Sequence, residues 1–491
     1  MSGFFHPTLS LEMQAVFRTA YGVLLFLTLV QAVPQARRFF VSDRWGGYAK
    51  SEPRIDLIQN PYVLPLVMAL WLLAALGLVL GRAPVVAALV NLLLCRYYFV
   101  GMRWKGVLRG MGAPGFMSYW LAACVFFLEH GLRHDPSGTV RTAALVAFKV
   151  DFAVIMLCAG TYKVLAGYPQ NDGMELGMIN PWWGYWGAFY AQMRPGSWIF
   201  RALNHLAYST EILAGLLMLV PATQLLGAFL IFSSFAFIAT QIRLGFLCEM
   251  VMLCALLYVP AGHPVDLAVA SAVHATPPVI THAPAWVNLG LAALLYAYAV
   301  LLPFAKVGQY YNFLARRPLP GRWQALLEEY TNVFGIIIWR VFSVDVTNFF
   351  ADILVRDADG RETVFAHPKR LEWSTRFRYW HVGEFICLAS LFTTLKYYAG
   401  NRDLFVERVV RYARTIPCPP GGRILFRYVS VRKDEAQFSY VPVAEFTVDP
   451  RAGTIEEKSL DPSFSVRAPS PVSPVHEGFK PGSYAPAEPV R

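Results

Sequence analysis

The chain has 491 residues, of which 56% are hydrophobic and only 15% are charged. Together with a mean hydropathy of +0.42, this composition is typical of a membrane protein with several spans rather than of a soluble domain. The net charge of +11 comes from basic residues scattered in short loops between apolar runs, which favours contact with anionic lipid headgroups and argues against a nucleic-acid partner.

Nine apolar runs are candidates for membrane spans. They cover about 13–33, 61–80, 84–102, 115–131, 142–166, 198–220, 222–242, 246–260 and 285–304. Basic residues concentrate in the first and third loops between these runs. By the positive-inside rule, the odd-numbered loops and the chain after the ninth run are expected in the cytoplasm, with the N-terminus outside.

The seven cysteines show no CxxC or CxxH spacing, and five of them lie in apolar runs. We therefore expect neither a disulfide framework nor a zinc or other metal site. No Lys or Arg precedes the first apolar run, so no cleavable signal is expected and this run should stay in the membrane. The sequence contains no HExxH, no GxSxG and no GxGxxG after a strand, which removes most soluble-enzyme functions.

The fifth run contains Lys149, Asp151 and Lys163. At about 100° and 1.5 Å per residue, the two lysines lie within roughly 40° of each other on one helix face and about 21 Å apart, while Asp151 points elsewhere. An ionisable residue inside a span indicates a functional site, and a desolvated lysine can supply the neutral amine that a general base requires. The structural alternative is that both lysines, being near helix ends, extend to the headgroups.

Further polar residues fall in or beside the other runs. His130 ends the fourth run beside Glu129, where a bond to a headgroup or to a backbone carbonyl is the simpler role. In the sixth run, His205, Tyr208 and Glu211 follow one another at three-residue steps, a spacing at which helix neighbours touch.

Gln241, Arg243 and Glu249 surround the turn between the seventh and eighth runs. Arg243 and Glu249 either pair and neutralise each other or form the polar wall of a ligand cavity. The loop before the sixth run, INPWWGYWGAFYAQMRPGSW, contains Trp182 and Trp183. It predicts an aromatic belt at the membrane interface or, alternatively, a wall for a flat, ring-bearing, lipid-soluble ligand.

The chain changes character after about residue 305. The stretch ADILVRDADGRETVFAH alternates apolar and polar residues around DADG, which predicts a β hairpin, and 423–448 predicts two or three more strands. The predicted fold class is mainly α, with a transmembrane helical bundle of about nine spans over 1–305. A small extramembrane α+β domain follows over 306–460, and the Pro- and Ser-rich tail, 461–491, is predicted to be disordered.

Several segments together resemble a known family. CAGTYKVLAGY with the Trp-rich loop, HLAYSTEILAGLLMLV, FIATQIRLGFLCEMVMLCALLY and, later, YAVLLPFAKVGQYYN, FGIIIWRVFSVDV and ILVRDADGRETVF resemble the horizontally transferred transmembrane (HTTM) domain, and the segments that follow it, in the vitamin-K-dependent γ-carboxylases. The resemblance covers the chain to about residue 460. From this resemblance we also expect a chemical role for Lys163.

In that family a membrane lysine after an Ala-Gly pair deprotonates vitamin K hydroquinone. Oxygen then converts the quinol to an alkoxide base and finally the epoxide, and the alkoxide removes a glutamyl γ-proton so that carbon dioxide can add. By position the resemblance assigns the lysine to Lys163, the assisting histidine to His130 and an acidic position to Glu211. Two departures stand out: Tyr162 replaces the first of the family's paired lysines, and the large extramembrane region that grips protein substrates in the animal enzymes has no counterpart here.

The resemblance implies an integral, multi-pass membrane lyase, in the inner membrane if the source is bacterial. Its co-substrates would be reduced vitamin K or another quinol, oxygen and carbon dioxide, and its partners membrane lipid and a peptide or protein substrate. Lys163 and His130 would be catalytic, and the quinol would contact the group Glu211, His205, Tyr208, Gln241, Arg243, Glu249, Trp182 and Trp183. The alternative is a non-enzymatic HTTM protein that binds lipid or quinone and assists peptide maturation or export.

Overall fold

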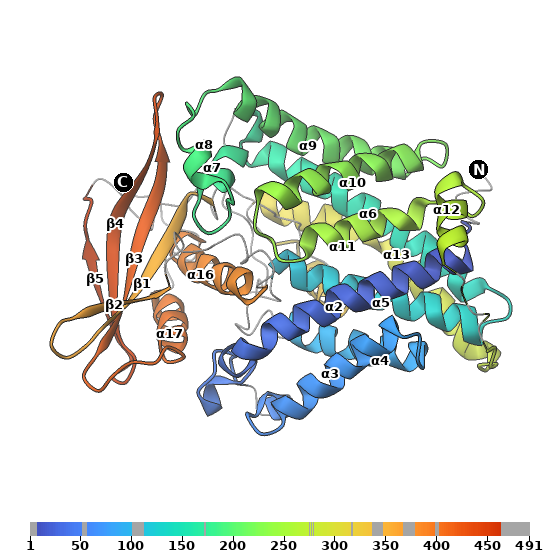
Figure 1. Cartoon of the computed structure of the whole chain (residues 1–491), viewed down its shortest axis with the longest axis horizontal. Coiled ribbons are helices and arrows are strands. Elements are labelled where there is room, and N and C mark those ends of the chain that lie inside the picture. Colours follow the sequence, from blue (N-terminus) through green and yellow to red (C-terminus); the bar gives the residue numbers. More distant parts are fainter. Residues whose placement is uncertain are drawn as a thin grey trace.

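The computed structural model describes residues 7–51, 56–100, 112–170, 173–315 without 274, 276 and 278, 318–335, 347–366, 379–397 and 402–462. These residues are mostly helical and include one five-stranded sheet. Figure 1 shows long helices forming a bundle, with the sheet at one end of the bundle and the N-terminus at the other. The tail predicted to be disordered lies outside the described residues from 463 onward.

The nine predicted apolar runs coincide with nine helices of the bundle. These are α2 (Leu11–Phe39), α3 (Leu64–Val79), α4 (Pro84–Cys95), α5 (Gly112–His134), α6 (Thr139–Leu165), α9 (Trp198–Met218), α10 (Gln224–Gln241), α11 (Leu247–Ala255) and α13 (Ala285–Ala315). Within the described residues this part also contains α7 (Met174–Ile179), α8 (Gly187–Tyr190), α12 (Pro264–Ala272) and α14 (Arg322–Phe334).

The expectation of about nine membrane spans is not supported. Within the described residues, four helices are long and apolar enough to cross a membrane: α2, α6, α10 and α13. Helices α3, α4 and α11 have 16, 12 and 9 residues, and at about 1.5 Å per residue they fall short of a hydrocarbon core about 30 Å thick. Most residues of α11 are buried inside the protein, and hydropathy alone does not distinguish such a buried helix from a lipid-facing span.

Helices α6 and α9 pack closely because each presents a glycine to the other. A Cβ added to Gly160 of α6 would lie 2.7 Å from the carbonyl oxygen of Tyr208, and one added to Gly215 of α9 would lie 2.8 Å from the amide nitrogen of Leu157. Small residues at such crossings let helix backbones approach. The close contact places the end of α6, with Lys163, against the middle of α9.

The sheet is antiparallel with strand order β2-β1-β3-β4-β5. Its strands are β1 (Phe349–Arg356), β2 (Glu362–Ala366), β3 (Arg423–Lys433), β4 (Phe438–Asp449) and β5 (Thr454–Ser459). The hairpin predicted around DADG is confirmed as β1–β2, and the strands predicted over 423–448 are confirmed as β3 and β4.

Two helices join the sheet to the bundle: α16 (Tyr379–Tyr397) and α17 (Arg402–Ala413). Phe392 of α16 contacts the rings of Phe405 on α17 and of Phe426 and Phe446 on the sheet. Figure 1 shows α16 between the sheet and the long helices. The predicted domain boundary at 305/306 falls inside α13, which continues to Ala315.

Candidate functional site

Lys163 and Glu211 form a buried ion pair between two helices of the bundle. Lys163 is in the last turn of α6, Glu211 is in α9, and their side chains are 5% and 2% exposed. The Lys163 ammonium contacts Oε1 of Glu211. Oε2 of Glu211 is buried and makes no hydrogen bond to any described residue. A charged pair with a free acceptor oxygen, held away from water, is the strongest candidate for proton chemistry in the described part of the chain.

Tyrosines surround this pair. Tyr162, next to Lys163, packs with Tyr310 of α13, and the Tyr310 hydroxyl donates to the carbonyl oxygen of Cys158 at 2.5 Å. Tyr168, in the turn after α6, is fully buried, and both Tyr168 and Tyr310 are close enough to interact electrostatically with Glu211. Tyr310 was not predicted as a site residue: it lies beyond the predicted end of the bundle, in the segment YAVLLPFAKVGQYYN.

His130 lies far from Lys163. Its Nε2 is 3.0 Å from Oδ1 of Asn288, and its ring is 5.1 Å from that of His134. The end of α5 that carries His130 packs against the start of α6, where a Cβ on Gly131 would lie 2.7 Å from the amide nitrogen of Arg141. Twenty-two residues separate Arg141 from Lys163, which corresponds to about 33 Å along the helix. The two predicted catalytic residues are therefore at opposite ends of α6.

His205 and Tyr208 contact each other but not the buried pair. His205 Nδ1 is 2.7 Å from the Tyr208 hydroxyl, on the exposed side of α9. At about 100° per residue, the six-residue step from His205 to Glu211 corresponds to one full turn of the helix plus about 240°. The side chains of His205 and Glu211 therefore point to different sides of α9. Three-residue spacing predicted the His205–Tyr208 contact, whereas Glu211 pairs with Lys163 of the neighbouring helix.

Arg243 holds in place the loop INPWWGYWGAFYAQMRPGSW, residues 179–198, which we call the aromatic loop. Its Nη1 donates to the carbonyl oxygen of Pro181 at 3.1 Å and to that of Gly184, and its guanidinium lies 4.8 Å from the centre of the Tyr185 ring. Burial lowers the pKa of Arg243 to about 10, while interaction with Tyr185 acts in the opposite direction. These contacts go to the loop rather than to Glu249, which is half-buried in the first turn of α11.

The aromatic loop joins the bundle to the sheet. Trp182 is fully buried, stacks on Phe385 of α16 at 5.4 Å and meets the Phe349 ring of β1 edge-on at 5.8 Å. Trp183, also buried, contacts Phe385 at 6.1 Å. Neither tryptophan lies in an exposed aromatic belt. Gln241, close by, accepts a hydrogen bond from the Tyr190 hydroxyl at 2.8 Å.

Asn180 is a loop residue that the sequence did not single out. Its Nδ2 donates to the carbonyl oxygens of Thr347 and Phe349, each at 2.8 Å, and its Oδ1 accepts from the amide of Trp182. A side-chain amide that satisfies three backbone groups holds β1 against the bundle. The sequence feature that could have identified Asn180 is its place in a turn that contains Pro and several Trp residues.

Asp151 belongs to a second buried polar group. Its Oδ2 accepts hydrogen bonds from Trp120 Nε1 at 2.8 Å and from the Tyr298 hydroxyl at 2.5 Å. Lys149 faces elsewhere, with its ammonium 5.0 Å from the centre of the Tyr258 ring. Lys149, Asp151 and Lys163, the three charged residues of the predicted fifth run, thus have three separate environments.

Within the described residues, no three His, Cys, Asp or Glu side chains are grouped so as to hold a metal ion. Comparison with models of known protein families, with curated proteins and with solved structures finds no match. The resemblance to the HTTM domain is therefore a hypothesis that rests on the sequence segments alone.

Proposed function

We propose that the chain is a multi-pass membrane protein in which Lys163 and Glu211 transfer a proton to and from a lipid-soluble quinol. The observation that carries the proposal is the buried ion pair between α6 and α9, with Oε2 of Glu211 left without a hydrogen bond among the described residues. Buried charges are costly, and a pair that also leaves an acceptor unused is more expected at a site of proton transfer than in a structural role.

The pair lets a normally protonated lysine act as a base. In a low-dielectric site, transfer of the proton from the Lys163 ammonium to the Glu211 carboxylate gives a neutral amine beside a neutral acid. The Lys163 amine then accepts a phenolic proton from the quinol, and Glu211 holds the first proton beside it. With oxygen and carbon dioxide, a bound quinol would supply the chemistry of the γ-carboxylases, which the sequence segments resemble, acting on a glutamyl or other substrate.

The neighbouring tyrosines suit a flat ring. Tyr162 and Tyr310 pack together beside Lys163, and aromatic side chains stack on or meet the edges of planar ligands. His130 has no part in this proposal, because it lies at the other end of α6. The remaining predicted contact residues, His205, Tyr208, Gln241, Arg243, Glu249, Trp182 and Trp183, support the fold around the site or lie on other faces.

The test compares two lysines of the same helix. Purified protein in lipid nanodiscs is incubated with reduced vitamin K or menaquinol, oxygen, labelled bicarbonate and a glutamyl peptide, and both epoxide and fixed label are measured. We expect Lys163→Met to lose activity by roughly 10²-fold or more, the usual contribution of a general base. Lys149→Met removes another buried lysine, which faces Tyr258, and it should retain activity.

Full epoxide formation in Lys163→Met would refute the assignment of the base. Fixed label without epoxide would point to a different chemistry. Epoxide without fixed label would keep the quinol chemistry and remove carboxylation.

One observation favours a second, non-enzymatic candidate. Lys163 and Glu211 neutralise each other, so the pair can also serve as a structural contact in a protein that holds lipid or quinone without converting it. Such a protein would bind menaquinone with the same affinity in the wild type and in Lys163→Met, and neither would form product in the assay above.

A further inference from the structure

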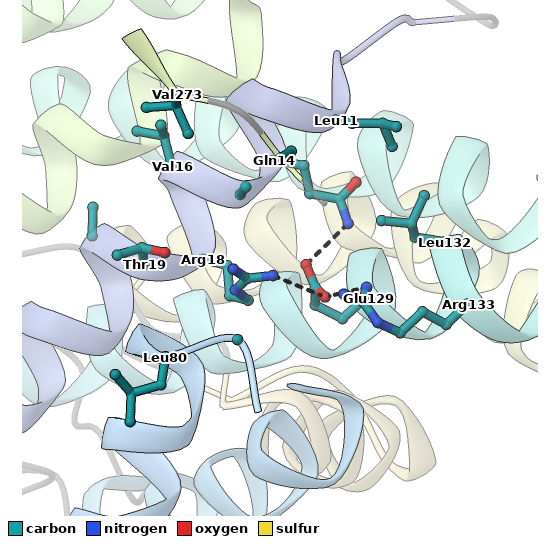
Figure 2. Close-up of a pocket in the computed structure, with 14 residues that line it drawn as sticks. Leu11, Gln14, Val16, Arg18, Thr19, Leu80, Glu129, Leu132, Arg133 and Val273 are labelled. Carbon is teal, nitrogen blue, oxygen red and sulfur yellow. Dashed lines mark hydrogen bonds and ion pairs between the residues drawn. The ribbon is translucent and has the colours of Figure 1, made fainter. Parts of the chain in front are cut away.

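A second group of charges lies at the end of the bundle away from the sheet. Arg18 of α2 and Arg133 of α5 both approach Glu129, at 3.7 Å and 2.5 Å from its Oε2. Oε1 of Glu129 accepts from Gln14 Nε2 at 3.1 Å. Figure 2 shows the two guanidinium groups meeting at this one carboxylate from different helices, with Gln14 above it.

These residues line a cavity of about 450 Å³, which we call the arginine cavity. It lies between α2, α5, the α3–α4 turn and two residues that follow α12, Val273 and Ala275. Its lining combines the charged group with apolar side chains, among them Leu11, Val16, Leu80, Leu132 and Val273. The volume lies within the range of small-molecule sites.

The cavity has more positive than negative charge. Its lining holds two arginines and one glutamate, and a third arginine, Arg141, lies behind it, donating to Gln14 Oε1 at 2.9 Å. Asp135 and Asp266, which lie near this end but outside the lining, accept hydrogen bonds from the amides of Val140 at 2.7 Å and Gly262 at 2.8 Å. The lining itself therefore carries one positive charge in excess.

Arg18 and Arg133 also keep donors available. Arg18 Nε donates to the carbonyl oxygen of Leu78 at 3.1 Å. Its Nη2 lies beside Gly81, 3.2 Å from the position that a Cβ on this glycine would occupy. The side chains of Arg18 and Arg133 are only 14% and 17% exposed. Two mostly buried guanidinium groups, with N–H donors that make no hydrogen bond to a described residue, form a fork suited to the oxygens of a phosphoryl group.

We propose that the arginine cavity binds the phosphoryl group of an anionic ligand, with Arg18 and Arg133 as its donors. The phosphoryl group can come from a phospholipid headgroup or from free phosphate. The apolar walls and the position at the end of the long helices fit an acidic phospholipid, whose acyl chains would lie against the leucine and valine side chains. This inference is independent of the chemistry at Lys163.

The experiment separates the two sources of phosphoryl group. Detergent-purified protein is titrated with dioleoylphosphatidylglycerol and retention is measured by native mass spectrometry, while stabilisation by millimolar inorganic phosphate is measured by thermal unfolding. The first variant is Arg18→Gln with Arg133→Gln. The second, Thr19→Trp, fills the cavity from a lining position and leaves every charge in place. Arg82→Gln, at an exposed site in the adjacent turn, is the matched control for charge.

We expect the wild type and Arg82→Gln to retain phosphatidylglycerol, and both cavity variants to bind it about tenfold more weakly or worse. The arginine variant loses charge-assisted hydrogen bonds, and the indole of Thr19→Trp occupies the space that the ligand needs. Stabilisation by phosphate that both cavity variants lose, without lipid retention in the wild type, would assign the site to free phosphate. Equal affinities for both ligands in the wild type and in both cavity variants would overturn the proposal. Should the arginine variant fail to fold, Thr19→Trp alone decides between these results.

Discussion

Lys163 and Glu211 depend on each other because each charge is buried. Removing one partner of a buried ion pair leaves the other unpaired at a cost of roughly 3–5 kcal/mol, whereas replacing both with apolar residues of similar size is often neutral. Lys163 and Glu211 are separated by 48 residues in the sequence, so helical periodicity within one segment could not predict their contact. Periodicity did place Lys149 and Lys163 on neighbouring faces, yet their partners come from different elements.

We expect Glu211→Leu to lower the free energy of unfolding by roughly 3 kcal/mol or more, because it leaves the buried Lys163 ammonium without a partner. Lys163→Met combined with Glu211→Leu should recover most of that loss. The measurement is a double-mutant cycle of unfolding in detergent, followed by tryptophan fluorescence. Additive effects of the two substitutions would contradict a direct ion pair.

At the scale of elements, the contact between α6 and α9 decides where the candidate site forms. Both helices were predicted from their apolar runs, but the glycines that let them approach gave no signal in the composition. A side chain at Gly160 would collide with the backbone of α9, and such a contact can be relieved only by moving the helix.

Gly160→Ala should therefore separate the two helices, lower the melting temperature in detergent by several degrees and weaken the Lys163–Glu211 contact. Gly290→Ala is the matched control, because a Cβ there meets nothing within 4 Å and Ala favours a helix over Gly by roughly 1 kcal/mol. Thermal unfolding of both variants checks the prediction. A melting temperature for Gly160→Ala as high as that of Gly290→Ala would contradict it.

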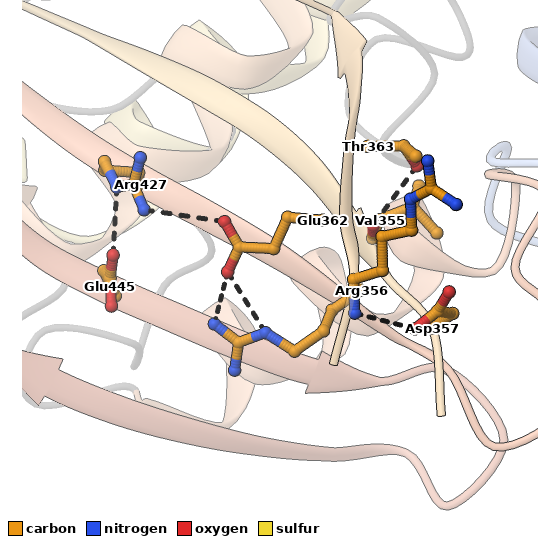
Figure 3. A network of polar contacts seen from close by, with 8 residues as sticks. Val355, Arg356, Asp357, Glu362, Thr363, Arg427 and Glu445 are labelled. Atoms are coloured by element: carbon orange, nitrogen blue, oxygen red, sulfur yellow. Dashed lines mark hydrogen bonds and ion pairs between the residues drawn. The ribbon is translucent and has the colours of Figure 1, made fainter. Parts of the chain in front are cut away.

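The sheet is an element whose two faces have different neighbours. Its inner face packs on α16 and α17, while Figure 3 shows a charged network, with Glu362 between Arg356 and Arg427, and Arg427 also paired with Glu445. Alternation in the sequence predicted the β1–β2 hairpin, and 423–448 was predicted to form further strands. It did not predict that buried tryptophans of the aromatic loop would lie between the sheet and the bundle.

For the whole molecule, the positive-inside rule and the structure can be tested together. The first loop contacts the sheet domain through Lys50 and Glu407 at 3.0 Å, so the basic first loop and the sheet lie at the same end. The arginine cavity and the exposed turn before α12 lie at the other end. If the long helices cross the bilayer as proposed, these two ends are on opposite sides of it.

We expect a membrane-impermeant maleimide to label Ala261→Cys in intact spheroplasts and to label Lys458→Cys only after lysis. Both positions are exposed, six native cysteines are buried, and the half-buried Cys418 is replaced by Ser in both variants. The expectation follows from the positive-inside rule, which predicts from the basic loops that the sheet end is in the cytoplasm. The reverse labelling would invert the orientation, and labelling of both positions before lysis would contradict a bundle with its ends on opposite sides.

The sequence by itself determined the local features: the helices at the apolar runs, the β1–β2 hairpin, and Lys163 as an ionisable residue inside an apolar helix. Each of these depends on residues close together in the chain, through hydropathy, periodicity or turn chemistry. The tertiary structure decided which apolar helices are long enough to span a membrane, that Glu211 faces Lys163 while His130 lies at the opposite end, and that Arg18 meets Arg133. Such pairings depend on helix crossings between distant segments, and packing sets these crossings through contacts that no single stretch of sequence contains.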